Sequence, residues 1–245
     1  MSSSHPSISV GSRASDAEAL KRAAARRAME EVRSGMVLGL GSGSTVAHFL
    51  ELLGHALASG ALRDVVAVPS SVGTETAART LGIPLTSLAR NPELDLTVDG
   101  ADEVSPDLDL IKGMGGALLR EKMIAQASAR FVIIADEGKA VARLGVLSPL
   151  PVEVVDWGWS GHVSFLEARG ASVRLREEAD GSPFRSDNGN VILHCRFPEG
   201  IVEPDRLEAE LSARAGVVGT GLFLGMADVA ALAGPDGVRV LERPA

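Results

Sequence analysis

The chain has 245 residues, a formal net charge of −8 and a single cysteine. This length allows one large core, or one main core with a smaller attached domain. Because the charge is negative and no run of lysines or arginines occurs, broad attraction to nucleic acid is excluded, and an anionic substrate would need locally placed cations.

Membrane insertion and secretion are not predicted. The 27 glycines interrupt the sequence so often that no apolar run approaches the roughly 20 residues of a bilayer span. Residues 1–15 are rich in serine and lack a hydrophobic signal core, so we expect a disordered tail there. The lone Cys195 cannot form an intrachain disulfide and is expected to be a small buried residue, which fits a cytoplasmic protein.

The first part of the chain alternates predicted helices and strands. A helix is expected over residues 16–34, opened by Ser15 or Asp16 as N-cap. Further helices are expected at 45–59 and 70–81, and strands at 36–40, 65–68, 94–99, 108–111 and 131–135. Short strands that alternate with helices indicate a parallel sheet covered on both faces, in which ligands bind beyond the carboxyl ends of the strands.

From residue 149 onward the order becomes strand, helix, two strands, helix, strand, which is typical of a ferredoxin-like α+β domain. Strands are expected at 152–155, 171–176 and 191–197, and helices at 160–169 and 204–214. The turn Asp187-Asn188-Gly189-Asn190 favours a hairpin between the second and third of these strands. Strands at 217–224, 229–233 and 238–241 are expected to return to the first sheet.

The predicted fold is therefore α/β: a Rossmann-like parallel sheet with helices on both faces, plus a smaller α+β (ferredoxin-like) domain. We expect the catalytic α/β domain to comprise residues 16–149 and 219–245, with the smaller domain inserted at residues 150–218. The motifs described next all lie in the larger domain.

A glycine- and serine-rich turn at residues 39–45 follows a predicted strand and opens a helix. Its unpaired backbone amides, the helix dipole and three hydroxyl groups favour an anion such as a phosphate. A dinucleotide fingerprint that starts at Gly39 would need glycine at position 44, where the chain has Ser44, and no lysine follows the glycines as in a Walker loop. A plain tight turn remains the alternative.

Asp99 and Asp102 follow a predicted strand and flank Gly100, which permits a tight turn that directs both carboxylates into one crevice. Two neighbouring acids titrate apart, so one can exchange protons while the other stays charged. Two alternatives remain open. One is a Mg²⁺ site that includes Glu103, and the other is a solvated turn whose carboxylates accept backbone amide hydrogen bonds.

Glu121 stands alone on an apolar face of a predicted helix, since the residues three and four positions away are apolar. Burial raises the pKa of a carboxyl group toward neutrality, as a general base requires. The alternative is a position on the rim, with an ion pair to an arginine of a neighbouring helix.

Lys112 follows a short predicted strand and precedes three glycines in four residues. The glycines expose backbone amides, and the Lys112 ammonium can neutralise an oxygen that becomes negative during a reaction. An ordinary surface lysine beside a flexible loop is the alternative. Lys139 and Lys21 are weaker cation candidates, and the histidines show no metal-ligand spacing.

Jointly, these segments resemble ribose-5-phosphate isomerase of the A type. The likeness rests on the segments 39–45, 99–103, 112–122 (KGMGGALLREK) and 135–139, joined by 150–154 and 187–193. Their order and spacing run from about residue 16 to 241, nearly the whole ordered chain, and together they are highly specific.

The resemblance implies interconversion of D-ribose 5-phosphate and D-ribulose 5-phosphate through an enediolate, in the non-oxidative pentose phosphate pathway, without a metal or organic cofactor. It also implies a homodimer or homotetramer. Glu121 would move a proton between C2 and C1, Asp99 would help to open the furanose ring, and Asp102 and Lys112 complete the catalytic set. The residues implied to contact substrate are Ser42, Gly43, Ser44, Thr45, Asp99, Gly100, Ala101, Asp102, Lys112, Gly113, Met114, Gly115, Lys139 and Lys21.

Two positions depart from the family pattern. Met114 stands where a third glycine is usual, so a left-handed backbone there would be strained and would shift the oxyanion amides. His194 stands where an acidic residue often occurs, but it lies in the smaller domain. Neither change removes a catalytic group.

Two other functions remain open from the sequence. A sugar-phosphate sensor would need an attached DNA-binding element, which the short tail before Asp16 does not supply. A relative of glucosamine-6-phosphate deaminase or of the CoA-transferases is the runner-up among enzymes.

Overall fold

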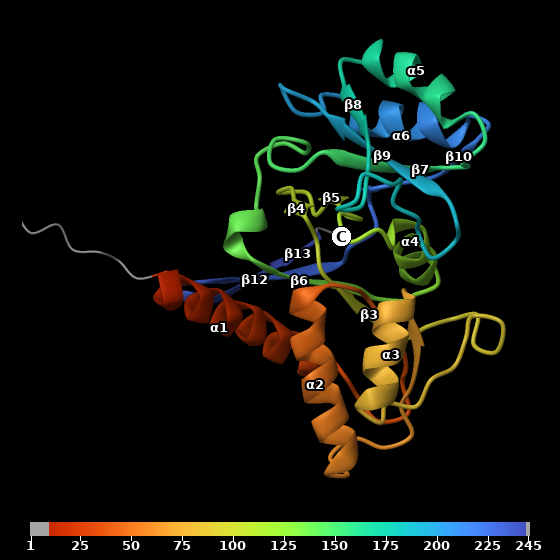
Figure 1. The fold of residues 1–245 in the computed structure, drawn as a ribbon. Coiled ribbons are helices and arrows are strands. Elements are labelled where there is room, and N and C mark those ends of the chain that lie inside the picture. Colours follow the sequence, from red (N-terminus) through yellow and green to blue (C-terminus); the bar gives the residue numbers. More distant parts are fainter. Residues whose placement is uncertain (1–9, 244–245) are drawn as a thin grey trace, which may run out of the picture.

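The computed structural model describes residues 10–243, which form three β-sheets and the helices that cover them (Figure 1). The largest sheet has the strand order β13-β12-β6-β3-β1-β2. Its strands are β1 (Val37–Leu40), β2 (Val66–Pro69), β3 (Leu96–Asp99), β6 (Phe131–Asp136), β12 (Val229–Gly234) and β13 (Gly237–Glu242). All neighbours are parallel except β13, which pairs antiparallel with β12. The predicted Rossmann-like sheet is confirmed.

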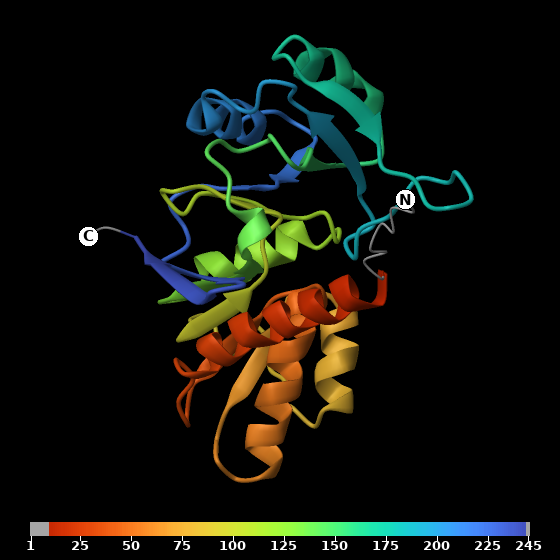
Figure 2. The same cartoon turned by 90° about the vertical axis from the view of Figure 1, so that its left-hand side faces the viewer.

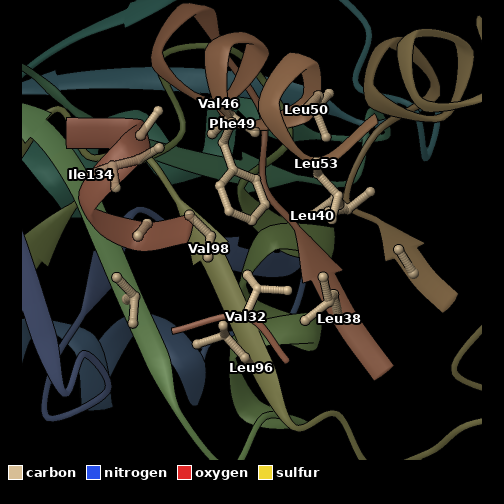
Figure 3. Packing of buried hydrophobic residues seen from close by; sticks show 14 of the residues in the cluster. Val32, Leu38, Leu40, Val46, Phe49, Leu50, Leu53, Leu96, Val98 and Ile134 are labelled. Carbon is tan, nitrogen blue, oxygen red and sulfur yellow. The ribbon is translucent and has the colours of Figure 1, made fainter. Parts of the chain in front are cut away.

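Helices cover the largest sheet on both faces. On one face, α1 (Val10–Met29) and α2 (Ser44–Ala58) pack over β3 and β6, and Phe49 lies at the centre of this core (Figure 3). The opposite face is covered by α4 (Leu118–Gln126) and the third sheet. α3 (Val72–Thr80) lies beside α2 and β2. Strands buried on both sides explain the continuous apolar runs of the sequence.

The first helix begins earlier than expected. Its backbone is helical from Val10, so the expectation of an N-cap at Ser15 or Asp16 is wrong, and residues 1–9 of the expected tail lie outside the described residues. Adding a turn to an existing helix costs much less than starting one. Because α1 is already held against α2, β6 and β12, the helix extends toward its N-terminus without a capping residue at position 15.

The second sheet is antiparallel, with the order β10-β7-β9-β8. Its strands and helices are β7 (Leu150–Val154), η2 (Trp159–His162), α5 (Val163–Glu167), β8 (Ser172–Leu175), β9 (Val191–Arg196), α6 (Pro204–Ser212) and β10 (Val217–Thr220). This is the predicted ferredoxin-like order. Figure 2 shows α5 and α6 at the end of the molecule opposite α2 and α3. The predicted pairing of β8 with β9 is confirmed, although residues 176–190 make a long connection in place of a tight hairpin.

The third sheet has the order β11-β5-β4, with β4 (Glu103–Val104), β5 (Leu110–Ile111) and β11 (Leu222–Phe223). The expectation that residues 217–224 return to the first sheet is therefore wrong, whereas β12 and β13 do return. The chain changes sheets at Gly221, whose N–H donates to the Pro151 carbonyl while its own carbonyl accepts from the Lys112 N–H. A side chain at Gly221 would overlap both neighbours. The expected domain boundary at residue 219 falls inside β10, and the two-domain division stays a prediction.

Across residues 10–243, no helix is both long enough and apolar enough to cross a membrane.

Candidate active site

The predicted motifs meet at the carboxyl ends of two neighbouring strands. From β1 the chain crosses to β2 on one side of the sheet, and it later returns to β3 on the other side of β1. Ligands in such sheets bind at this point of reversal. The turn at 39–45 follows β1, and Asp99 is the last residue of β3.

A pocket of about 220 Å³ lies at this reversal point. Most residues that the resemblance implied to contact substrate line it. They are Ser42, Gly43, Ser44, Thr45, Gly100, Ala101, Asp102, Lys112, Gly113, Gly115 and Lys139, and Glu121, the expected base, lines the pocket with them. Asp99 is fully buried and contacts the lining residue Lys112.

The Lys112 ammonium links the acids of the site. Its Nζ lies 2.9 Å from Asp99 Oδ2 and 3.4 Å from Glu121 Oε2, and it donates a hydrogen bond to the Gly100 carbonyl at 2.6 Å. The residue is 2 % exposed, so it is not the surface lysine of the alternative interpretation. Burial opposes its charge, but the two carboxylates more than offset this effect and raise the pKa of Lys112 above its usual value.

Asp99 is held by the turn after β1. Its Oδ1 accepts hydrogen bonds from the N–H groups of Ser42, at 3.0 Å, and Gly100, at 2.7 Å. Burial raises the pKa of Asp99, and the charge of Lys112 and the two amides oppose this rise. The amide-accepting turn of the alternative interpretation is thus present, but Asp99 is fully buried and pairs with Lys112, so this carboxylate is not solvated.

Glu121 lies in the first turn of α4 and is 4 % exposed. Its ion-pair partner is Lys112, so the alternative of a rim position paired with an arginine is wrong. Burial, with the negative charge of Asp99 as the second cause, raises the pKa of Glu121 to about 8. A carboxyl group with such a pKa can take up and release protons near neutral pH.

The three acids of the magnesium alternative point to different partners. Asp102 Oδ2 accepts a hydrogen bond from the Met114 N–H at 3.0 Å. Glu103 is fully buried and accepts hydrogen bonds from the N–H groups of Gly145, at 2.6 Å, and Leu147, at 2.7 Å. Glu103 therefore holds a loop of the protein and is turned away from the pocket.

Sequence reasoning missed the partners of Ser42. Its hydroxyl lies 2.9 Å from that of Ser70, 2.8 Å from that of Ser71 and 3.0 Å from that of Thr74. These three residues follow β2, the neighbour of β1, so the strand order was the signal that could have found them. Three hydroxyl groups of the turn, those of Ser42, Ser44 and Thr45, were expected to surround an anion. The hydroxyl of Ser42 instead forms hydrogen bonds within the protein.

The comparisons with known proteins agree on one family. The family model described as ribose 5-phosphate isomerase A (phosphoriboisomerase A) matches residues 66–237. A ribose-5-phosphate isomerase A from Roseiflexus castenholzii is 53% identical over 91% of this chain and 95% of its own. The chain belongs to the ribose-5-phosphate isomerase A family.

Solved structures of this family share the fold. A ribose 5-phosphate isomerase from Plasmodium falciparum matches with a TM-score of 0.90 and 39% identity, over 93% of this chain and 100% of its own. A D-ribose-5-phosphate isomerase in complex with phospho-erythronic acid matches with the same TM-score and identity, over 93% of this chain and 99% of its own.

The departure from the family at Met114 causes no backbone strain. Among the described residues, Asp64 and Leu108 are the non-glycine residues with positive φ, and Met114 is not one of them. The left-handed positions fall on Gly113, with φ 105°, and Gly116, with φ 95°. The expectation of strain at Met114 is wrong, because the loop needs glycine on either side of it. Met114 lines a different cavity.

The two weaker cation candidates, Lys139 and Lys21, differ in their position relative to the pocket. Lys139 ends η1 (Glu137–Lys139), after β6, and lines the pocket. Lys21 lies on α1, is absent from the pocket lining and forms an ion pair with Glu18 at 2.6 Å. The structure thus does not bring Lys21 to the site, and its role in substrate binding stays a prediction.

The structure explains why the segment at residues 187–193, one of those that carry the family resemblance, lies close to the site. The fully buried Glu153 of β7 accepts hydrogen bonds from Ser186, at 2.7 Å, Asn190, at 2.9 Å, and Asn188, at 3.2 Å. This network fixes the loop that approaches α4, where Arg120 donates to the Asn188 side chain at 3.0 Å. The segments 150–154 and 187–193 therefore hold the second sheet beside α4, the helix that carries Glu121.

Proposed function

We propose that this chain interconverts D-ribose 5-phosphate and D-ribulose 5-phosphate in the 220 Å³ pocket, by proton transfer through an enediolate. The observation that carries the assignment of roles is the buried Glu121 carboxylate, 3.4 Å from the Lys112 ammonium. The pocket is smaller than the roughly 300–1,000 Å³ of drug-sized sites, which suits a compact phosphosugar. The phospho-erythronic acid of the solved relative is a small phosphorylated sugar acid, and it shares a phosphate group and a hydroxylated carbon chain with a phosphosugar.

The phosphate group is assigned to the N-terminus of α2. Gly43, Ser44 and Thr45 line the pocket there, and the first turn of a helix offers unpaired N–H groups and a positive dipole end. Lys139 adds a cation to the same pocket. The sugar carbons then extend toward Lys112 and Glu121.

Glu121 is the base of the proposed reaction. Its carboxylate takes the proton from C2 of the aldose and returns it to C1, while the hydroxyl proton of O2 passes to O1. This gives the ketose and restores the carboxylate. Between these steps an oxygen of the enediolate bears negative charge. The Lys112 ammonium, held by Asp99 at 2.9 Å, neutralises this charge without having to move into place.

Asp99 and Asp102 are assigned to the protons on the sugar oxygens. Asp99 is fully buried and contacts the pocket through Lys112, so we assign to this pair the transfer of a proton to the ring oxygen when the furanose opens. Asp102 also accepts from the Met114 N–H, and it thereby connects the turn after β3 to the glycine loop at 113–116.

Isomerisation in deuterated water tests this proposal. Incubation with ribose 5-phosphate should yield ribulose 5-phosphate that carries deuterium at C1, because the proton on Glu121 exchanges with solvent. The rate should be unchanged when a chelator is added. Ketose formation that stops with chelator, or release of ammonia from glucosamine 6-phosphate in its place, would contradict the proposal.

The proposal includes a cytoplasmic location and assembly into a homodimer or homotetramer. One feature of the chain supports the location. Cys195, the single cysteine of the sequence, is a free and fully buried thiol, which suits a reducing compartment. Light scattering checks the assembly, and a monomer at about micromolar concentration would contradict it.

A further inference from the structure

A second cavity, of about 740 Å³, lies beside β8 and β9 of the second sheet. Its lining includes three arginines, Arg174, Arg176 and Arg196, together with His194, whereas Glu177 is its one acidic side chain. This excess of positive charge is unexpected in a chain whose net charge is −8. A gathering of guanidinium groups in a concave site is the arrangement that recognises phosphate and carboxylate groups.

The strand register brings these cations to one face. Arg174 of β8 pairs with His194 of β9, and Ser172 pairs with Arg196. Since side chains alternate along a strand, Arg174 and Arg176 point to the same side of the sheet, as do His194 and Arg196. The opposite side of β9 packs into the apolar core under α5 and α6 (Figure 1).

Two residues that line this cavity each have a buried nitrogen atom without a protein partner. Within the described residues, neither Arg176 Nη1 nor His194 Nε2 has a hydrogen-bond partner. The Arg176 guanidinium stacks on Phe184, 3.6 Å from the ring centroid, so its position is fixed. Arg196 donates to the carbonyl of Leu147, which is a neutral group, and between residues 10 and 243 it forms no ion pair. The Arg176 guanidinium N–H is always a donor, and His194 Nε2 donates in the tautomer that carries its proton, so this pair favours an acceptor-rich ligand.

The cavity shares the glycine loop with the catalytic pocket. Gly113 and Gly115 line the catalytic pocket, and Met114, between them, lines the second cavity. The Met114 N–H donates to Asp102, and a side chain at Gly116 would meet Arg176. A ligand that moves Met114 or Arg176 would therefore shift the amides of the catalytic pocket.

We propose that this cavity is a second, regulatory site for a small oxyanion of the diphosphate class, which carries more negative charge than the monophosphate of the substrate, and that the site is coupled to the catalytic pocket through Met114. Arg174 and Arg196 bind the anion from the open side, and Arg176 and His194 donate from the buried side. Occupation holds the glycine loop in one arrangement and changes kcat.

Inorganic pyrophosphate is the probe. Calorimetric titration is carried out in an equilibrium mixture of ribose 5-phosphate and ribulose 5-phosphate at saturating concentration, so that the catalytic pocket is occupied. We expect one pyrophosphate per chain, and binding about tenfold weaker or more in Arg174→Glu. Arg174→Lys should keep most of the affinity. The matched control is Arg239→Glu, because Arg239 is also an exposed arginine on an edge strand, β13, but lies outside the cavity.

The same variants test the coupling. At saturating substrate, pyrophosphate should change kcat of the unmodified chain and of Arg239→Glu, and it should leave kcat of Arg174→Glu unchanged. Absence of pyrophosphate binding, or equal affinity in Arg174→Glu, would overturn the site. If a second copy of the chain covers the cavity, pyrophosphate will not bind and Arg174→Glu will change the oligomeric state. This outcome would also overturn the site. Binding without any effect on kcat would overturn the coupling.

Discussion

Asp99 occupies the space that a side chain at position 41 would need. A Cβ built on Gly41 overlaps the Asp99 carboxylate, and the next residue, Ser42, donates its N–H to that carboxylate. The turn after β1 and the end of β3 therefore fit only when residue 41 has no side chain. This fit holds Asp99 against Lys112.

Gly41→Ala should lower both activity and stability. The added methyl group displaces the Asp99 carboxylate from Lys112, and overpacking of this kind costs about 1–3 kcal/mol. Thermal unfolding and kcat measure the two effects. The matched control is Gly73→Ala on α3, where the nearest atom to the new Cβ is 3.8 Å away and where alanine is favoured over glycine by up to about 1 kcal/mol. Wild-type activity in Gly41→Ala would contradict the assigned role of Asp99.

Glu121→Gln should keep the fold and substrate binding but lose turnover. Glutamine has nearly the same shape, but it cannot accept the proton, and loss of a general base costs about 10²- to 10⁴-fold in kcat. Steady-state kinetics and circular dichroism check this. Glu75→Gln, which removes a surface ion pair with Arg79 on α3, serves as control and should be fully active. Near-native turnover of Glu121→Gln would remove the assignment of the base.

The pH profile should report the raised pKa of Glu121. In the free enzyme the base has to be ionised, so kcat/KM should rise with pH as the carboxyl group loses its proton, with a midpoint near the pKa of about 8. An ordinary glutamate would give a midpoint near 4.5. The profile is measured from about pH 5 to about pH 9 and compared with that of Glu121→Gln, in which this limb should be absent. A constant kcat/KM down to pH 5 would contradict the buried base.

Much of this site could be predicted because it depends on local pattern and strand order. The apolar neighbours of Glu121 predict its burial, and short strands that alternate with helices predict that the turn at 39–45 and Asp99 meet at one edge of the sheet. Neither prediction needs a contact between distant side chains to be known in advance.

The parts that could not be predicted depend on such contacts. Glu103 is next to Asp102 in sequence, but successive residues of an extended chain point to opposite sides, and its partners are N–H groups of a distant loop. The partners of Ser42 depend on β2 lying beside β1. Whether Met114 or its neighbours take positive φ depends on where the loop must turn, which residue type alone does not fix.

Lys112→Ala should reduce kcat far more than it changes KM. The ammonium acts on charge that develops during the reaction, so its loss removes transition-state stabilisation. It also leaves Asp99 and Glu121 buried without a cation, which costs about 3–5 kcal/mol of stability. The control is Lys122→Ala, because Lys122 also lies over the Phe223 ring but pairs with Glu208 outside the pocket. An effect on KM alone would reassign Lys112 to phosphate binding.

Glu121→Gln should also change the pH dependence of stability. The pKa of Glu121 is raised from 4.5 to about 8 in the folded chain, so between these pH values the folded chain binds a proton that the unfolded chain has lost. The contribution of the protonated Glu121 carboxyl group to the free energy of unfolding is therefore fully present below pH 4.5, and it is lost as the pH rises through the pKa of the folded chain.

Glutamine does not titrate, so the unfolding free energy of Glu121→Gln relative to wild type should increase from about pH 4.5 to about pH 8 and level off above it. Denaturant unfolding at several pH values measures this difference. For Glu75→Gln, on the surface of α3, the difference should stay small at every pH. A difference for Glu121→Gln that stays constant or falls with pH would mean that the folded chain holds this carboxylate charged, and a base activated by burial would then be excluded.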